Sequence, residues 1–388
     1  MKNKLRSKCL CCNKGKLNEI INLGLHSFAD RFVPKKKLNI IDPKYPLILD
    51  MCNNCKFIQS RVVTDPKNRY LEIDYSYTSS NSNYSRNHWV EFADSLEKKT
   101  ILKNKKIIEI GSNDGFLSYL LKKKGAEVLG VDASEFMVKI SKKKIKKLFG
   151  KADIIIANNV FNHSDKPLDF LKGVYNLLKE NSIFIFEQPN FTVGVLSLKF
   201  DQIYHEHVSY FTARNIKSIL DYSNLKILSL SKNKYHGGSL RTVAAKKNSS
   251  LKEFKIDKFI NYENKKSIYK LEFYKKMIKK INYKKKFLLS TLINLSTKGY
   301  VIAGVGAGAK SNTFLTFYGL DYKIIKFLTD SSLFKKNKYT PVTRIIIKDD
   351  KELIKYKKIA CIILSWNISN LVINKIKKLN KKIKIIHT

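Results

Sequence analysis

The sequence lacks the features that mark membrane-inserted or exported chains. No window of eighteen consecutive apolar residues occurs in it, which argues against a membrane-spanning helix. The first residues, Met-Lys-Asn-Lys-Leu-Arg, contain no apolar signal-peptide core. Both absences predict a cytoplasmic protein with no membrane partner.

Arginine is scarce, although the chain is strongly basic. Arg accounts for eight of the 75 Lys and Arg residues, and the formal net charge is +43. Surfaces that bind phosphate usually use Arg, whose planar fork matches phosphate geometry, and they cluster their charge on one element. Here Lys is spread along the whole length, which indicates a compositional bias on solvated faces. We therefore expect no specific nucleic-acid partner and only a mildly favourable field for anionic ligands.

The six Cys residues are poor candidates for disulfides in a reducing compartment. Their spacing favours a metal site, because Cys9-x-x-Cys12 and Cys52-x-x-Cys55 supply the four thiolates of a closed, structural zinc site. A set of isolated buried thiols is the alternative. Cys11 is a second candidate within the first pair, although only Cys9 and Cys12 have the two-residue gap.

Composition and periodicity divide the 388 residues into four expected segments. Residues 1–65 form a small loop-rich module, residues 66–248 an α/β unit, residues 249–294 Lys-rich helices that link domains, and residues 295–388 a second, smaller α/β unit. Strands that alternate with helices imply a mainly parallel sheet covered on both faces. In the larger unit we expect strands near residues 106–110, 127–131, 153–157 and 182–187, a closing pair of strands within 226–245, and helices near 116–124, 134–149 and 167–179.

A turn rich in Gly and acidic residues follows the first of these strands. The stretch Glu109-Ile-Gly-Ser-Asn-Asp-Gly115 leads into a helix, and Asp132 ends the next strand. Glycines here let the backbone approach a ligand, and the acidic residue can bind ribose hydroxyls. A carboxylate in the turn disfavours a pyrophosphate, so S-adenosylmethionine fits better than a dinucleotide, with a generic α/β turn as the alternative. The predicted cofactor contacts are Glu109, Gly111, Asn113, Asp114, Gly115 and Asp132.

A second glycine-rich turn, Gly304-Val-Gly-Ala-Gly-Ala-Lys310, also lies between a strand and a helix, and Asp330 ends the following strand. Its backbone amides and Lys310 could hold a phosphate group of a nucleotide diphosphate. A purely structural turn explains the same pattern equally well. The sequence leaves this choice open.

The densest group of proton-carrying side chains is Tyr204-His-Glu-His207. Three interpretations compete: surface histidines, a metal site made by two His and one Glu, or acid/base chemistry in which Glu206 orients His207 as a general base. Tyr75 and Tyr77 are further proton-carrying groups, unless they are half-buried strand aromatics. His163 follows the strand 153–157, which places it at the carboxyl edge of the sheet, where ligands bind in open α/β folds.

Together these motifs resemble the sugar C-methyltransferase family, whose members add a methyl branch to a deoxysugar carried by a nucleotide diphosphate. The resemblance covers nearly the whole chain, and the motifs around Tyr204 and His236 are the most specific. The matching stretches are the two Cys pairs, Tyr75-x-Tyr77-x-Ser79-Ser80, Glu109 to Gly115, Ala157-Asn-Asn-Val160 with His163, Tyr204 to His207, His236-Gly-Gly-Ser-Leu-Arg241, Gly304 to Lys310, and Trp366-Asn367.

The resemblance implies an N-terminal zinc-binding domain, a Rossmann-like methyltransferase core and a smaller C-terminal Rossmann-like domain that helps to hold the nucleotide sugar. It implies S-adenosylmethionine and structural zinc as cofactors. His207 would remove the proton beside a ketone, with Glu206 orienting it, and the remaining catalytic residues would steady the enolate. The implied catalytic residues are His207, Glu206, Tyr204, Tyr77 and His163; Asn158 joins the cofactor contacts; the implied substrate contacts are Tyr75, His236, Gly237, Gly238, Arg241, Lys310 and Asp330.

Two departures from the family pattern stand out. Asp132 lies 21 residues before Asp153, where the family usually has a further strand and helix that frame the adenine. In Thr340-Pro-Val-Thr-Arg344 a Val replaces the Gly that usually follows the Pro. The shortened core leaves open a degenerate member that binds a nucleotide sugar without methylating it. The Cys pairs and the basic charge leave open a nucleic-acid methyltransferase. The sequence indicates no oligomeric state.

Overall fold

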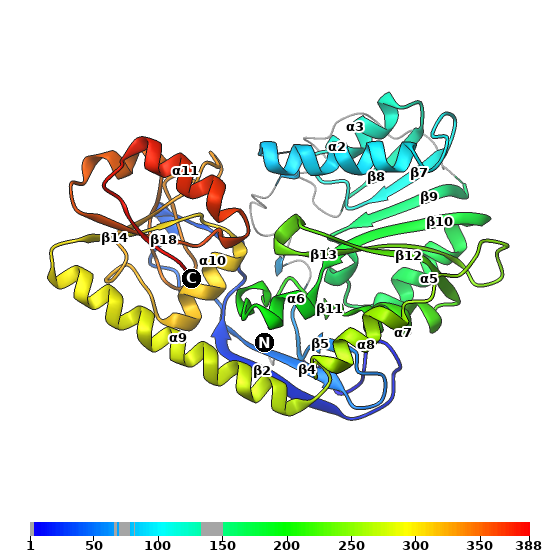
Figure 1. Cartoon of the computed structure of the whole chain (residues 1–388), viewed down its shortest axis with the longest axis horizontal. Coiled ribbons are helices and arrows are strands. Elements are labelled where there is room, and N and C mark those ends of the chain that lie inside the picture. Colours follow the sequence, from blue (N-terminus) through cyan, green and yellow to red (C-terminus); the bar gives the residue numbers. More distant parts are fainter. Residues whose placement is uncertain (1–3, 66–67, 70–77, 81, 133–149) are drawn as a thin grey trace.

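The computed structural model describes residues 4–65, 68–69, 78–80, 82–132 and 150–388. These residues form three parts, each built on its own sheet (Figure 1). No helix among the described residues is long and apolar enough to cross a membrane.

The N-terminal part is an antiparallel sheet with the strand order β11-β5-β4-β2. Its edge strand β11 (Ser209–Tyr210) comes from the middle of the chain and pairs with β5 (Ile58–Ser60). Two short ladders accompany this sheet, and one of them, between β3 and β16, joins the N-terminal part to the C-terminal one. The other strands are β1 (Lys4–Leu5), β2 (Leu17–His26), β3 (Val33–Pro34), β4 (Tyr45–Cys52), β6 (Val62–Val63) and β16 (Lys338–Tyr339).

The central part is a six-stranded sheet in the order β12-β13-β10-β9-β7-β8. Strands β8, β7, β9 and β10 are parallel, and β13 runs antiparallel to both β10 and β12. This confirms the parallel α/β core and the closing strand pair predicted from the sequence. The strands are β7 (Lys106–Ile110), β8 (Glu127–Val131), β9 (Ala152–Asn158), β10 (Leu178–Pro189), β12 (Leu225–Asn233) and β13 (Ser239–Lys246). The expected helix at 134–149 lies outside the described residues.

Both faces of the central sheet are covered, because its strands alternate their apolar side chains between two cores. Ile154 and Ile156 of β9 pack with α2 (Asn83–Glu97) and α3 (Phe116–Lys123). Ile155, on the opposite face, packs with the other core. The helices of that core are α5 (Pro167–Leu177) and α7 (Ala213–Asp221).

The C-terminal part is a five-stranded parallel sheet in the order β17-β15-β14-β18-β19. The long helix α9 runs below both this part and the N-terminal sheet (Figure 1), and all three contribute to one hydrophobic core. The segment expected to be a linker is therefore a packed structural element. The elements here are α8 (Asp257–Lys265), α9 (Leu271–Thr297), β14 (Val301–Val305), α10 (Ala309–Tyr318), β15 (Phe327–Thr329), β17 (Ile347–Lys348), β18 (Ile359–Ile363), α11 (Ser369–Leu379) and β19 (Lys384–Ile386).

Candidate active site

Four thiols of the N-terminal part converge as the Cys pairs predicted. The sulfur atoms of Cys9, Cys12, Cys52 and Cys55 all lie within 4.8 Å of one another. The Sγ–Sγ distance is 3.5 Å between Cys9 and Cys55 and 3.7 Å between Cys12 and Cys52. Four converging sulfurs fit a tetrahedral zinc site with no open position, which is typical of structural zinc. Cys11 is buried beside this group but is not one of the four.

The turn after β7 is shaped by close packing. Gly111 has φ +73°, and a Cβ atom on it would lie 2.0 Å from Cγ2 of Val160. The Asn113 amide donates to Oδ2 of Asp132 at 2.8 Å. Ser118 donates to the buried carboxyl of Glu109, and burial raises the pKa of Glu109 to about 8. Glu109 is therefore largely protonated at neutral pH.

The side chains of Asn113 and Asp114 hold the segment Ser79–Ser80. Oδ1 of Asn113 accepts from the Ser79 amide at 2.8 Å. Asp114 accepts from the amide and the hydroxyl of Ser80 at 2.9 and 2.7 Å. We expected both residues to contact the cofactor; in this structure their side chains also anchor this segment. Tyr75 and Tyr77, which precede it, lie outside the described residues.

The end of β9 offers groups that fit an adenosyl ligand. Both polar side-chain atoms of Asn158 are buried without a hydrogen-bond partner among the described residues. An amide that can donate and accept at the carboxyl edge of the sheet is suited to a polar ligand. Strand β8 ends the sheet in the described part of the chain. Residues 133–149 are not described, so the loss of an adenine-framing strand stays a prediction.

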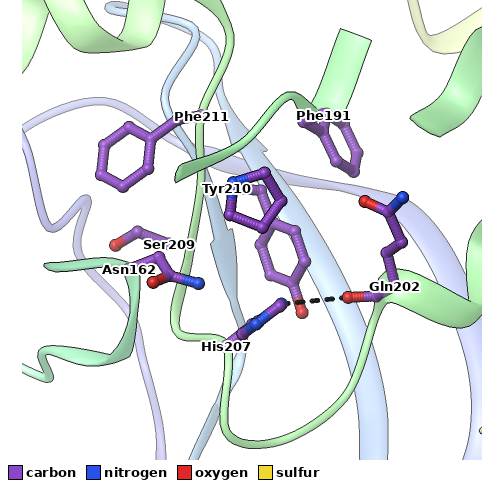
Figure 2. Close-up of a pocket in the computed structure, with 8 residues that line it drawn as sticks. Asn162, Phe191, Gln202, His207, Ser209, Tyr210 and Phe211 are labelled. Carbon is purple, nitrogen blue, oxygen red and sulfur yellow. Dashed lines mark hydrogen bonds between the residues drawn. The ribbon is translucent and has the colours of Figure 1, made fainter. Parts of the chain in front are cut away.

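His207 lies at the centre of the expected catalytic segment. Its Nδ1 is 3.1 Å from the carbonyl oxygen of Gln202 (Figure 2). Because a carbonyl only accepts, Nδ1 carries the proton and Nε2 keeps its lone pair. The ring centroid of Tyr204 is 4.0 Å from that of His207, and the ring centroid of His163 is 5.1 Å away.

Both histidines are held in the neutral state. Burial, reinforced by the nearby Lys310 charge, lowers the pKa of His207 well below its ordinary value. Burial and the Arg69 charge lower the pKa of His163 to about 3. A neutral imidazole with a free Nε2 lone pair can accept a proton.

Glu206 has partners other than the expected one. Its Oε1 accepts from the amides of Ala29 and Asp30 at 2.9 and 3.2 Å. Burial and the Asp30 charge raise the pKa of Glu206 to about 7. Since Nδ1 of His207 faces Gln202, the backbone of Gln202 orients this ring, in contrast to the expectation that Glu206 does so. The carboxylate instead fastens the segment to the N-terminal part.

The first residues of the segment His236–Arg241 contact the C-terminal part, whereas Arg241 pairs with a buried residue of the central sheet. The His236 carbonyl accepts from Nζ of Lys310 at 3.0 Å, and a Cβ on Gly237 would lie 2.3 Å from the Trp366 ring. Gly238, with φ +123°, accepts through its carbonyl from the Asn190 amide. We expected Arg241 to bind substrate, but it forms an ion pair at 2.8 Å with Glu187, whose side chain is fully buried. This pairing follows from the register, which sets Glu187 of β10 opposite Arg241 of β13.

The backbone amides of the second glycine-rich turn donate hydrogen bonds to other residues of the C-terminal part. Gly306 donates to the Thr329 carbonyl and Ala307 donates to Oδ2 of Asp330, both at 2.8 Å. Gly308 donates to the Ser311 hydroxyl at 3.2 Å. These contacts favour the structural explanation for the turn and for Asp330.

Lys310 is the exception in this turn, because it reaches toward the central part. Burial lowers its pKa to about 8, and its Nζ lies 4.8 Å from the centroid of the Trp366 ring. Nε1 of Trp366 in turn donates to Oδ2 of the buried Asp201 at 2.6 Å.

The departure at Thr340–Arg344 has a local explanation. Val342 has φ +62°, a conformation that glycine adopts at lower cost. Its amide donates to Oδ2 of Asp42 at 2.8 Å, and Nη2 of Arg344 donates to the Ile40 carbonyl at 2.6 Å. The loop is thereby fixed against the N-terminal part.

Sequence reasoning missed Gln202, Ala29 and Asp30, which position the segment Tyr204–His207. Gln202 and Ala29 act through backbone atoms, so their side-chain types carry no signal. Asp30 lies 176 residues before Glu206, and no local pattern connects them.

Three family models match consecutive parts of the chain. They are described as "Putative zinc binding domain" for residues 9–70, "Methyltransferase domain" for residues 84–230 and "C-methyltransferase C-terminal domain" for residues 234–387. C-methyltransferase NovU from Streptomyces niveus is 22% identical over 385 residues, which cover 95% of this chain and 91% of that protein.

Two solved structures are similar to part of the chain, each with a TM-score of 0.35. Magnesium protoporphyrin IX methyltransferase from Synechocystis PCC 6803 is 20% identical, and the match covers 42% of this chain and 83% of that protein's chain. An S-adenosylmethionine-dependent methyltransferase from Clostridium acetobutylicum ATCC 824 is 16% identical, and the match covers 43% of this chain and 93% of that protein's chain.

Proposed function

We propose that this chain, which belongs to the S-adenosylmethionine-dependent C-methyltransferase family, methylates a ring carbon beside the ketone of a nucleotide-linked keto-deoxysugar. The observation that carries the proposal is His207, buried and neutral, with its proton fixed on Nδ1 by Gln202. Its unprotonated Nε2 can accept a proton from carbon next to a carbonyl. We also propose a cytoplasmic setting, in which thiols stay reduced.

In this mechanism Nε2 of His207 takes the proton from the carbon beside the ketone. Charge then develops on the carbonyl oxygen, where Tyr204, His163 and Tyr77 would donate hydrogen bonds to it. Bound S-adenosylmethionine supplies the electrophilic methyl group. Its proposed contacts are Glu109, Gly111, Asn113, Asp114, Gly115, Asp132 and Asn158.

For the nucleotide sugar we favour Lys310 and His236, which meet where the central and C-terminal parts join. With a pKa of about 8, Lys310 is mostly protonated at neutral pH, which suits an anionic diphosphate. Arg241 and Asp330 already have protein partners, so we assign them supporting roles. Tyr75, Gly237 and Gly238 complete the proposed substrate contacts.

The test combines S-adenosylmethionine with a panel of nucleoside diphosphate keto-deoxysugars in deuterated water. We expect the wild-type chain to exchange the proton beside the ketone and to form a methylated sugar. His207→Asn should abolish both reactions while it keeps affinity for S-adenosylmethionine in titration calorimetry. The surface variant Lys355→Met should behave as wild type.

Two results would overturn parts of the proposal. Exchange and methylation that persist in His207→Asn would remove His207 as the base. Methylation of nucleic acid, with no sugar of the panel modified, would remove the sugar substrate.

A further inference from the structure

A small cavity lies against the proposed base. Asn162 and Ser209 line it on one side and Gln202 on the other, with His207 between them (Figure 2). Phe191 and Phe211 are among the apolar residues that close it. Its volume of about 10 Å³ is close to the smallest space that holds one water molecule.

Two buried polar atoms on this wall have no hydrogen-bond partner among the described residues. They are Oδ1 of Asn162 and Oγ of Ser209, and each residue is only 2% exposed. Buried polar atoms nearly always have a partner, and ordered water supplies it where protein does not. A carbonyl oxygen accepts and a hydroxyl both donates and accepts, so each atom offers a hydrogen bond to water.

We propose that this cavity binds one ordered water, which bridges Asn162 and Ser209 and supports the positively charged form of His207 during the reaction. The cavity is too small for a sugar, and the two unpartnered polar atoms on its wall offer hydrogen bonds to a water. Asn162 and Ser209 are then positioning residues that act through the water.

The electrostatic surroundings of His207 explain why this water matters. The positive charge that faces its ring is that of Lys310, which opposes a second positive charge there. His163 and His236 also face the ring, but burial lowers the pKa of each, so both are neutral. The other facing rings, Tyr204 and Tyr210, are neutral groups. Once His207 takes a proton, a water dipole can reorient to solvate the imidazolium. This step rests on the proposed role of His207 as the base, whereas the water site itself does not.

The first test is a crystal structure of the full chain at a resolution that shows ordered waters. We expect a water within hydrogen-bonding distance of both Asn162 and Ser209. It should be lost in Asn162→Leu and retained in Asn162→Asp, which keeps an acceptor. An empty cavity in the wild type would overturn the proposal, and because no substrate is needed, that failure leaves the proposed function standing.

The second test is the pH dependence of kcat on an accepted substrate. Asn162→Leu and Ser209→Ala should lower kcat by up to about tenfold, the limit set by a fall of one unit in the pKa of the base. Affinity for S-adenosylmethionine should be unchanged. Asn162→Asp should shift the acid limb to higher pH and Asn162→Leu should shift it to lower pH. Ser249→Ala is the matched control, since Ser249 is another buried hydroxyl without a partner among the described residues. If the acid limb of kcat shifted equally in the Asn162 variants and in the Ser249→Ala control, the role proposed for the water would be contradicted.

Discussion

At the scale of single residues, two buried carboxyl groups of the site keep their protons to high pH. Burial raises the pKa of Glu109 to about 8, and burial with the Asp30 charge raises that of Glu206 to about 7. In the unfolded chain both return to the ordinary value of 4.5. Between these limits the folded protein binds more protons than the unfolded chain, so its free energy of unfolding falls as the pH rises.

Glu109→Gln tests this linkage, because Gln cannot ionise. The stability from the raised pKa of Glu109 is fully present below about pH 4.5 and is lost as the pH rises through about 8. We therefore expect the variant to lose less stability than the wild type across this range, as measured by denaturant unfolding at several pH values. Glu19→Gln, at an exposed position, is the control and should keep the wild-type slope. A slope unchanged by Glu109→Gln would show that Glu109 is already ionised in the folded protein.

The residue types of the site were predictable, but many of their partners were not. The rings of His207, His163 and Tyr204 lie close together. One motif follows β9 and the other precedes β11. The bond from His207 to the Gln202 carbonyl depends on how the backbone turns. Arg241 illustrates a second limit, since strand register directs it to Glu187. Contacts set by register or by distant backbone atoms leave no local sequence signal.

At the scale of elements, the two glycine-rich turns look alike in sequence and differ in what they hold. Each has an acidic residue that accepts from a turn amide, Asp132 from Asn113 and Asp330 from Ala307. In the C-terminal turn a Cβ on Gly306 would lie 1.9 Å from Oγ of Ser365. The positions of the strands and helices could be predicted from periodicity. The reason for glycine at each turn position could not, because it depends on side chains that pack there only in the folded protein.

Gly111→Ala tests the packing of the first turn. The added methyl group would lie 2.0 Å from Cγ2 of Val160, at a φ of +73°. We expect a loss of stability of about 1–3 kcal/mol and weaker binding of S-adenosylmethionine, measured by thermal unfolding and calorimetry. Val160→Ala should partly rescue the variant, because it relieves the clash but not the backbone strain. Gly173→Ala, inside α5 with no atom within 4 Å of the added Cβ, is the control and should be neutral or stabilising.

At the scale of the whole molecule, the proposed catalytic segment is fastened to both the N-terminal and the C-terminal part. Strand β11, which begins two residues after His207, completes the N-terminal sheet. The Ser60 amide donates to the Val208 carbonyl at 2.8 Å. From the C-terminal part, Thr313 donates to the Ile203 carbonyl at 3.1 Å. The zinc-binding part therefore reaches the site through its sheet, which Cys52 joins as the last residue of β4.

This connection predicts that loss of zinc changes the active site. A structural zinc contributes directly to folding, and in Cys52→Ser with Cys55→Ser the sheet that carries β11 loses that support. We expect loss of bound zinc, a lower Tm and faster hydrogen exchange at residues 204–210, with exchange in β14 and β18 unchanged. Cys11→Ser, a buried thiol outside the four-sulfur set, should keep its zinc and its protection at these residues. Unchanged metal content and Tm in the double variant would remove the structural zinc. Faster exchange confined to the Cys pairs would instead show that the metal stabilises its own loops without supporting His207.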